Sequence, residues 1–192
     1  MKWIKQLSWI LFGILCLTQV SIVGLQIVKY ERILTKGEIF YFDVLPFDPY
    51  DPFRGRYVTL RFKGASQAPL AQGEEPMEGL RGYALLEQDK NITVIKEVSF
   101  NKPKRGTFLE VNVYSTDALY RDTHTTQGIM VHFSLPFDRF YMREDLAPQA
   151  EMLLRARSGV AIKAKLRVLE GKGIIEDLMV GDVSLSQFIL TQ

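Results

Sequence analysis

Three aspartates stand close together in the first third of the chain, and they are the residue types best suited to chemistry. Carboxylates near one another can act as a general acid and base, or can hold a divalent cation. Asp48 and Asp51 each precede a proline, however, and an aspartate in that position commonly caps its own backbone in a turn. Asp43 is the third carboxylate, and Arg54, Arg56 and Arg61 follow closely enough to neutralise the group. The pattern therefore favours a structural role over acid–base catalysis.

The two histidines are the other candidates for catalysis or metal binding. His124 falls in a polar stretch, and His132 falls on the polar face of an expected strand. Neither has a histidine or cysteine neighbour at the spacing of metal ligands, and the only cysteine, Cys16, lies in an apolar run. A serine–lysine protease set is also missing, because no serine occurs between Ser21 and Ser66. We therefore predict solvated or hydrogen-bonded histidines, no catalytic residue, no metal and no cofactor.

The segment Leu45–Tyr57 combines prolines with aromatic residues. Its prolines, at positions 46, 49 and 52, fix their own φ angles and hold the chain extended or turning. Such restriction lowers the entropy cost of ordering a binding surface, and aromatic residues and arginine are enriched at interfaces. We expect most of the aromatic residues near this segment to pack in the core, with Tyr50 and Phe53 as candidates for exposure.

The motif that follows resembles the signature of a known family. The run Gly55-Arg56-Tyr57-Val58-Thr59-Leu60-Arg61-Phe62 is similar to the GDYXXLXY motif of the bacterial family named after it. Gly55, Tyr57 and Leu60 match that motif. Arg56 stands where the family has aspartate, and Phe62 replaces the last tyrosine. A catalytic role for the aspartate would leave this protein inactive, whereas a binding or packing role tolerates the exchange.

A second segment, Arg139–Glu144 followed by Glu151, is similar to a later family pattern of an aromatic pair, a glutamate and a helical glutamate. The resemblance implies a membrane-anchored bacterial protein whose biochemical role is unassigned. Together with the loop, it gives a candidate interface. The residues of this interface are Asp48, Asp51, Arg54, Gly55, Arg56, Tyr57, Leu60, Glu144 and Glu151.

The N-terminal region reads as a membrane anchor. Residues 7–28 form a run of 22 residues without a charged side chain, and Lys5 and Lys29 bound the run. As a helix it would be about 33 Å long, close to the roughly 30 Å of a bilayer core. The run is too long for the core of a cleaved signal peptide, and no small-residue cleavage site follows it. We therefore predict a cytoplasmic tail at 1–6, a transmembrane anchor at 7–28 and an extracytoplasmic domain at 37–192.

Charge placement bears on orientation and on partners. Basic residues flank both ends of the apolar run in nearly equal number, so the positive-inside rule does not decide the orientation. A short N-terminal tail and the family resemblance both favour an extracytoplasmic domain at the bacterial inner (cytoplasmic) membrane. The formal net charge of the whole chain is +2, and no basic stripe runs through the domain, which excludes a nucleic-acid partner. The sequence leaves the oligomeric state open.

The domain is predicted to be mainly β (α+β), an antiparallel β domain with one short helix. Alternating apolar residues predict strands at 37–44, 57–62, 82–87, 92–98, 109–114, 128–135, 160–168 and 174–180. A helix is expected to begin near Asp145 and to end before Gly159. Residues 63–81 and 115–127 read as irregular loops. Leu-Pro-Phe-Asp occurs at 45–48 and again at 135–138, which is either chance or the mark of a pseudo-repeat of 37–114 and 128–192.

These features favour a non-catalytic accessory or binding module. It would dock on a polytopic membrane protein through the Leu45–Tyr57 loop, and the anchor would hold it in the lipid bilayer. Two alternatives remain. One is a carboxylate-based or metal-dependent envelope hydrolase that uses Asp48, Asp51 and Glu144, and the other is a binder of an envelope ligand through an exposed aromatic groove.

Overall fold

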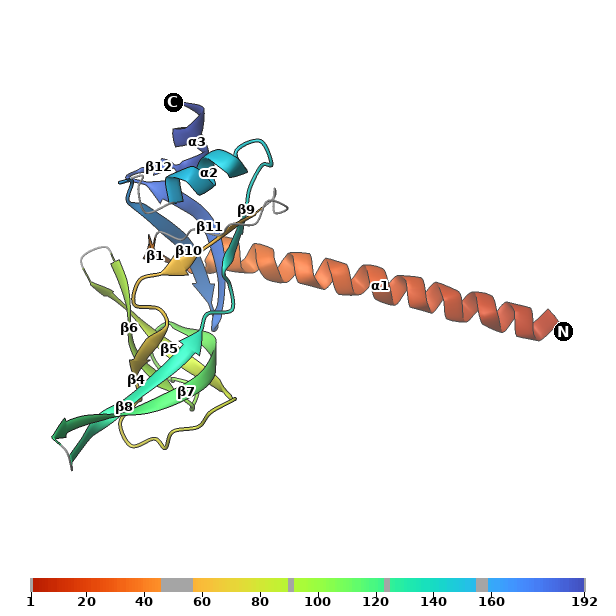
Figure 1. Cartoon of the computed structure of the whole chain (residues 1–192). Helices are drawn as coiled ribbons and strands as arrows, with labels where there is room; N and C mark the ends of the chain where they lie inside the picture. The colour runs from red at the N-terminus through yellow and green to blue at the C-terminus, as the bar shows by residue number, and fades with distance from the viewer. Residues whose placement is uncertain (1, 46–56, 90–91, 123–124, 155–158, 192) are drawn as a thin grey trace.

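The structure, a computed structural model, describes residues 2–45, 57–89, 92–122, 125–154 and 159–191. Figure 1 shows one long N-terminal helix that projects from a domain built mostly of antiparallel strands. The predicted fold class, an apolar N-terminal helix followed by an antiparallel β domain, is confirmed.

The N-terminal helix, α1 (Lys2–Lys36), is long and apolar enough to cross a membrane. Within the segment Trp9–Lys36, the apolar 18-residue window has a mean hydropathy of 2.1, and no residue of this window is buried against the domain. A helix that is apolar all round and lacks protein cover fits a lipid surrounding. The helix does not end at Val28, where the predicted anchor ends, but continues without interruption to Lys36.

Two five-stranded sheets form the domain. The first has the strand order β12-β11-β10-β1-β3. Its strands are β1 (Glu38–Leu45), β3 (Arg61–Phe62), β10 (Ile162–Leu169), β11 (Lys172–Val180) and β12 (Val183–Ser184). The second has the order β4-β8-β7-β5-β6. Its strands are β4 (Gln67–Pro69), β5 (Arg81–Asp89), β6 (Ile92–Ser99), β7 (Phe108–Asp122) and β8 (Thr125–Ser134). All the strand pairs of both sheets are antiparallel.

A two-stranded ribbon and two short helices complete the described part of the domain. The ribbon pairs β2 (Tyr57–Thr59) with β9 (Arg139–Tyr141). Helix α2 (Ala147–Leu154) buries Ala150 and Leu154, because these positions share one face of the helix. Helix α3 (Leu185–Leu190) follows β12 directly and is an addition to the one short helix expected from the sequence.

The core forms where alternating apolar side chains of the strands meet. Strand β10 shows the pattern most clearly, since every second residue from Ile162 to Val168 is buried. The largest side chains that are almost fully buried come from both sheets and from α3; they are Phe42, Phe133, Leu109, Leu166, Leu178 and Leu185. One cluster of buried residues therefore joins the two sheets.

Hydrogen bonds also connect the sheets. The backbone N–H of Tyr41 in β1 donates to Thr93 Oγ1 in β6 over 3.0 Å. The N–H of Glu110 in β7 donates to the carbonyl of Gly171 over 2.8 Å. Gly171 has φ 85°, and a Cβ atom there would lie 2.7 Å from Phe108. Only glycine fits this turn, which brings the β10–β11 hairpin against β7.

The junction between α1 and β1 contains no linker. Ile33 in the last turns of the helix is only 3% exposed. The N–H of Gly37 donates to the carbonyl of Ile33 over 2.9 Å, and the carbonyl of Gly37 accepts a 3.2 Å hydrogen bond from Arg167 Nη1. Strand β1 begins one residue later, so the helix and the first sheet are joined rigidly.

The sequence-based prediction of elements was wrong in three places. The expected strand 57–62 divides at Leu60 into β2 and β3, which pair with different partners. The expected loop 63–81 contains β4, a strand of only three residues. The expected irregular segment 115–127 contributes to the β7–β8 hairpin, which extends beyond the part of β7 that pairs with β5. A hairpin that leaves the core needs no buried face, so its sequence carries no apolar alternation.

The pseudo-repeat remains a prediction. Strand β1, from the first expected half, lies in one sheet with β10, β11 and β12, from the second. The two Leu-Pro-Phe-Asp segments cannot be compared as a pair, because Pro46–Asp48 lie outside the described residues.

Candidate functional site

Five of the nine predicted interface residues lie outside the described part of the chain; they are Asp48, Asp51, Arg54, Gly55 and Arg56. So do Tyr50 and Phe53, the two aromatic residues expected to be candidates for exposure. The structure places the other four interface residues. Tyr57 and Leu60 lie around the division between β2 and β3, and Glu144 and Glu151 lie before and within α2.

Tyr57 is half-buried and belongs to a group of rings and charge on the two-stranded ribbon. It pairs with Tyr141, and the two ring centroids are 5.5 Å apart. The guanidinium carbon of Arg139 lies 4.9 Å from the centre of the Tyr57 ring, which is the geometry of a cation–π contact. Tyr141 is 67% exposed. We call Tyr57, Arg139 and Tyr141 the Tyr57 cluster.

The second half of the motif points into the core instead. Leu60 is 3% exposed, and its N–H donates to the carbonyl of Asp138 over 2.7 Å. The Phe62 ring packs edge-on against Phe42 and Phe137, with centroid separations of 6.0 and 5.8 Å. The second Leu-Pro-Phe-Asp segment therefore holds the motif through Phe137 and Asp138. The motif has one outward-facing tyrosine and two packing residues.

Glu144 and Glu151 are not brought together with a third acidic residue. Glu144 is exposed, and Glu151 is half-buried on α2. Beside Glu144, Arg143 donates two hydrogen bonds of 3.1 and 2.7 Å to Asp145, and these bonds lower the pKa of the Asp145 carboxyl. Within the described residues, no group of three histidine, cysteine, aspartate or glutamate side chains could hold a metal ion.

His132 forms a hydrogen bond within the sheet, as the sequence predicts. Its Nε2 atom lies 2.8 Å from Asp117 Oδ2 on the neighbouring strand β7. The ring also lies near Tyr114, with 6.3 Å between the centroids. The prediction of a hydrogen-bonded histidine is confirmed for His132, whereas His124 lies outside the described residues.

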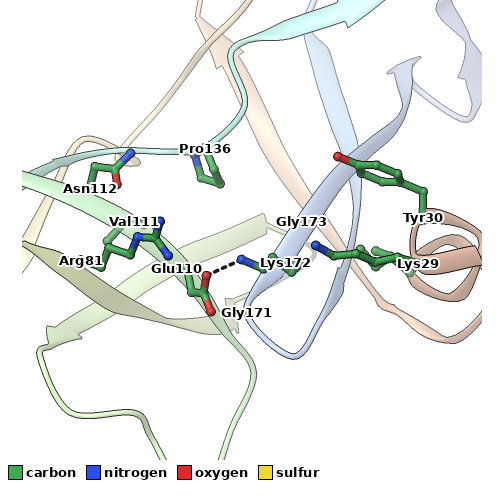
Figure 2. Close-up of a pocket in the computed structure, with 11 residues that line it drawn as sticks. Lys29, Tyr30, Arg81, Glu110, Val111, Asn112, Pro136, Gly171, Lys172 and Gly173 are labelled. Carbon is green, nitrogen blue, oxygen red and sulfur yellow. Dashed lines mark hydrogen bonds and ion pairs between the residues drawn. The ribbon is translucent and has the colours of Figure 1, made fainter. Parts of the chain in front are cut away.

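Sequence reasoning missed a pocket between α1 and the two sheets. This basic pocket has a volume of about 270 Å³. It is lined by Lys29, Tyr30, Ile33, Arg81, Glu110, Val111, Asn112, Pro136, Gly171, Lys172 and Gly173. Figure 2 shows Lys29 and Tyr30 reaching from the helix toward the strands, with Arg81 and Asn112 on the far side. Arg81 and Asn112 are paired in register across β5 and β7.

Two of the residues that line the basic pocket form an ion pair. Lys172 Nζ lies 2.5 Å from Glu110 Oε2, so the hairpin turn that carries Lys172 is tied to β7 (Figure 2). Among the described residues, no carboxylate lies within 4.0 Å of Lys29 or Arg81. The lining therefore carries three positive charges against one negative charge.

A second cavity adjoins the basic pocket along α1. This apolar cavity has a volume of about 320 Å³. It is lined by Leu25, Val28, Lys29, Arg32, Ile33, Leu169, Glu170 and Lys172. Lys29, Ile33 and Lys172 line both spaces, so the two are neighbours. Lys29 and Tyr30 were visible in the sequence as the end of the anchor, but their strand partners come from distant segments.

A half-buried carboxylate supports the same junction from the opposite strands. Glu176 is the extra residue of a β-bulge in β11, and its carboxylate accepts hydrogen bonds from Lys165 and Arg167 of 2.9 and 2.6 Å. Burial alone would raise the pKa of Glu176, but the two hydrogen bonds and the two positive charges outweigh it and lower the pKa. Glu176 therefore forms a charge pair across the strands with both Lys165 and Arg167. Arg167 also bonds Gly37, so the bulge reaches the end of α1.

The fold and these contacts define a class: a protein with one apolar helix that can span a membrane, joined directly to an antiparallel β domain. The family model named GDYXXLXY protein matches residues 19–178. The chain belongs to the GDYXXLXY family, as its motif at 55–62 suggests. No curated protein and no solved structure matches the chain.

Proposed function

We propose that the protein is a membrane-anchored accessory module that docks on a polytopic membrane protein through the face formed by the Leu45–Tyr57 loop and the Tyr57 cluster. The Tyr57 cluster is the observation that carries this proposal. Tyrosine and arginine are enriched at binding hot spots, because they combine apolar area with hydrogen-bonding groups. Tyr57 and Arg139 are held by their ribbon, so little entropy would be lost when a partner covers them.

The rigid helix junction supports a partner within the same membrane. In Figure 1, where α1 runs across the view, β9 lies on the side of the domain from which the helix projects. Because α1 passes into β1 without a linker, the Tyr57 cluster stays at a fixed height relative to the apolar helix. A surface held near the bilayer meets membrane-embedded partners more readily than soluble ones.

The proposal includes a location. We place α1 in the bacterial inner membrane with the N-terminus in the cytoplasm and the domain on the extracytoplasmic side. The family membership supports this orientation. The envelope-hydrolase alternative remains a hypothesis without a favouring observation, because Asp48 and Asp51 lie outside the described residues and Glu144 is exposed.

Co-purification with matched tyrosine variants tests the docking face. Full-length protein is isolated from native membranes in mild detergent, and the bound proteins are quantified by mass spectrometry. We expect one polytopic membrane protein in stoichiometric amount, and at least tenfold less of it with the double variant Tyr57→Ala, Tyr141→Ala, since hot-spot residues cost about 2 kcal/mol or more each.

Tyr114→Ala is the matched control. Tyr114 is 59% exposed on β7, outside the Tyr57 cluster, so its replacement should leave the partner in place. Equal recovery of the partner with the double variant and with wild type would remove the Tyr57 cluster from the interface. A photo-crosslinking residue at position 141 gives a second readout, because the adduct identifies whatever lies against the cluster.

A further inference from the structure

We infer that the basic pocket and the apolar cavity together form a binding site for one anionic phospholipid, with the phosphate in the basic pocket and an acyl chain along the apolar cavity. The inference does not depend on the docking proposal, because it uses other residues. It rests on three observations: the depth of both cavities relative to the bilayer, the charge of the basic pocket and the lining of the apolar cavity.

The helix fixes the depth of the site. Residues 7–28 carry no charged side chain, and Lys29 is the first charge after them. Lys29, Tyr30 and Ile33 form one wall of the basic pocket. Lysine and tyrosine at the end of a membrane span lie at the level of the lipid headgroups. The basic pocket therefore opens where phospholipid phosphates are concentrated.

The charges of the basic pocket fit a phosphate. Lys172 is already paired with Glu110, which leaves Lys29 and Arg81 as the cations without a described carboxylate partner. Arginine binds phosphate through a planar fork of donors, and lysine adds a point charge. Tyr30 and Asn112 bring a hydroxyl and an amide to the same pocket (Figure 2). These neutral donors can bond the remaining phosphate or glycerol oxygens.

The apolar cavity decides between a lipid and a free phosphate ester. Leu25 lies about one helical turn deeper than Lys29, and Val28 lies one residue deeper, both within the apolar run. With Ile33 and Leu169 they offer an apolar surface continuous with the basic pocket. A soluble phosphate ester would leave this surface uncovered, whereas an acyl chain would cover it. The arrangement of charge above apolar lining matches an amphipathic ligand in its bilayer orientation.

Native mass spectrometry of the full-length protein tests this site. The protein in mild detergent is mixed with equal amounts of dioleoylphosphatidylglycerol and dioleoylphosphatidylcholine, and the ratio of the two bound species is measured. We expect one phosphatidylglycerol bound in preference to phosphatidylcholine. Lys29→Gln and Arg81→Gln should each lower that preference about fivefold, and the double variant about thirtyfold, as expected for loss of one or two cations near a lipid surface.

Three comparisons make the result specific. Arg105→Gln removes an exposed arginine that lines neither cavity, and it should keep the wild-type preference. The charge-conserving variants Lys29→Arg and Arg81→Lys should retain most of it, which separates charge from damage to the fold. sn-Glycerol 3-phosphate, added in place of lipid, should bind far more weakly than phosphatidylglycerol.

Three results would overturn the inference. Equal retention of the two lipids by the wild-type protein would show that the charge of the pocket selects nothing. Equal losses of preference with Arg81→Gln and Arg105→Gln would assign any selectivity to general surface charge. Binding of glycerol 3-phosphate as tight as that of the lipid would make the ligand a soluble ester and leave the apolar cavity without a role.

Discussion

Glu176 connects three parts of the molecule through one carboxylate. The β-bulge in β11 turns its side chain toward Lys165 and Arg167 of β10, and Arg167 in turn bonds the carbonyl of Gly37 at the end of α1. A β-bulge changes the direction of a side chain, and it leaves one residue of the strand without a paired residue on the neighbouring strand. Here it places a single anion beside two strand cations that have no other carboxylate partner among the described residues.

We predict that Glu176→Gln destabilises the folded domain by about 1–2 kcal/mol at neutral pH, because two partly buried cations lose their charged partner. The pKa of Glu176 is lowered in the folded state. Its stabilisation is therefore fully present above the unfolded value near 4.5 and is lost as the pH falls through the lower folded pKa. The difference in melting temperature between wild type and variant should shrink as the pH drops below about 4.5.

Thermal unfolding of the full-length protein, followed by circular dichroism between pH 3 and pH 8, measures this difference. Glu75→Gln is the control, since Glu75 is exposed in a loop. A constant gap between Glu176→Gln and wild type across this pH range would contradict the assigned role of the carboxylate.

Elements that follow a simple alternation could be predicted from the sequence, whereas those set by distant partners could not. Phe40 and Phe42 alternate with half-buried neighbours, and β1 appears where expected. The apolar alternation through Val58, Leu60 and Phe62 was also correct, since all three are buried. The alternation says nothing of pairing, however, and the change of partner at Leu60 depends on Asp138, which lies far along the chain.

In the candidate site, too, some residues could be predicted from the local sequence and others could not. Lys29 and Tyr30 were recognisable as the end of an anchor, because the charge-free run stops there. Arg81 and Lys172 carry no local signal, since they become neighbours of the helix only when the two sheets assemble. The predicted interface residues came from a motif, and only the outward tyrosine among those described joins an exposed cluster.

At the scale of elements, Gly37 allows the end of α1 and strand β10 to approach its backbone closely. A Cβ atom at this position would lie 2.4 Å from the carbonyl oxygen of Ile33 and 3.1 Å from the backbone nitrogen of Val168. Both atoms belong to the backbone and cannot move aside as a side chain can. We predict that Gly37→Ala costs about 1–3 kcal/mol of stability, as overpacking of a tight site does.

Gly24→Ala is the control, because Gly24 lies within α1 with no atom within 4 Å of the new methyl group. Melting temperatures of both full-length variants in the same detergent measure the effect. Equal melting temperatures of the two variants would show that the junction accommodates a methyl group at position 37, and that it is not rigid.

At the scale of the whole molecule, the orientation of the domain is the prediction to settle first. In a Cys16→Ser background, Glu75→Cys places one thiol in an exposed loop of the domain. We expect a membrane-impermeant maleimide to label this thiol in cells whose outer membrane has been permeabilised and whose inner membrane is intact. The reason is that we place the domain outside the cytoplasmic membrane. Cys16→Ser alone reports the background. Labelling that requires disruption of the inner membrane would place the domain in the cytoplasm.

The missing linker between α1 and β1 has a mechanical consequence. A transmembrane helix that is longer than the local bilayer is thick responds by tilting. Here Ile33, Gly37 and Arg167 fasten the helix to the first sheet. Each degree by which the helix leans is thus a degree by which the domain leans. With α1 in a bilayer, the thickness of that bilayer would therefore set the angle at which the domain faces the membrane.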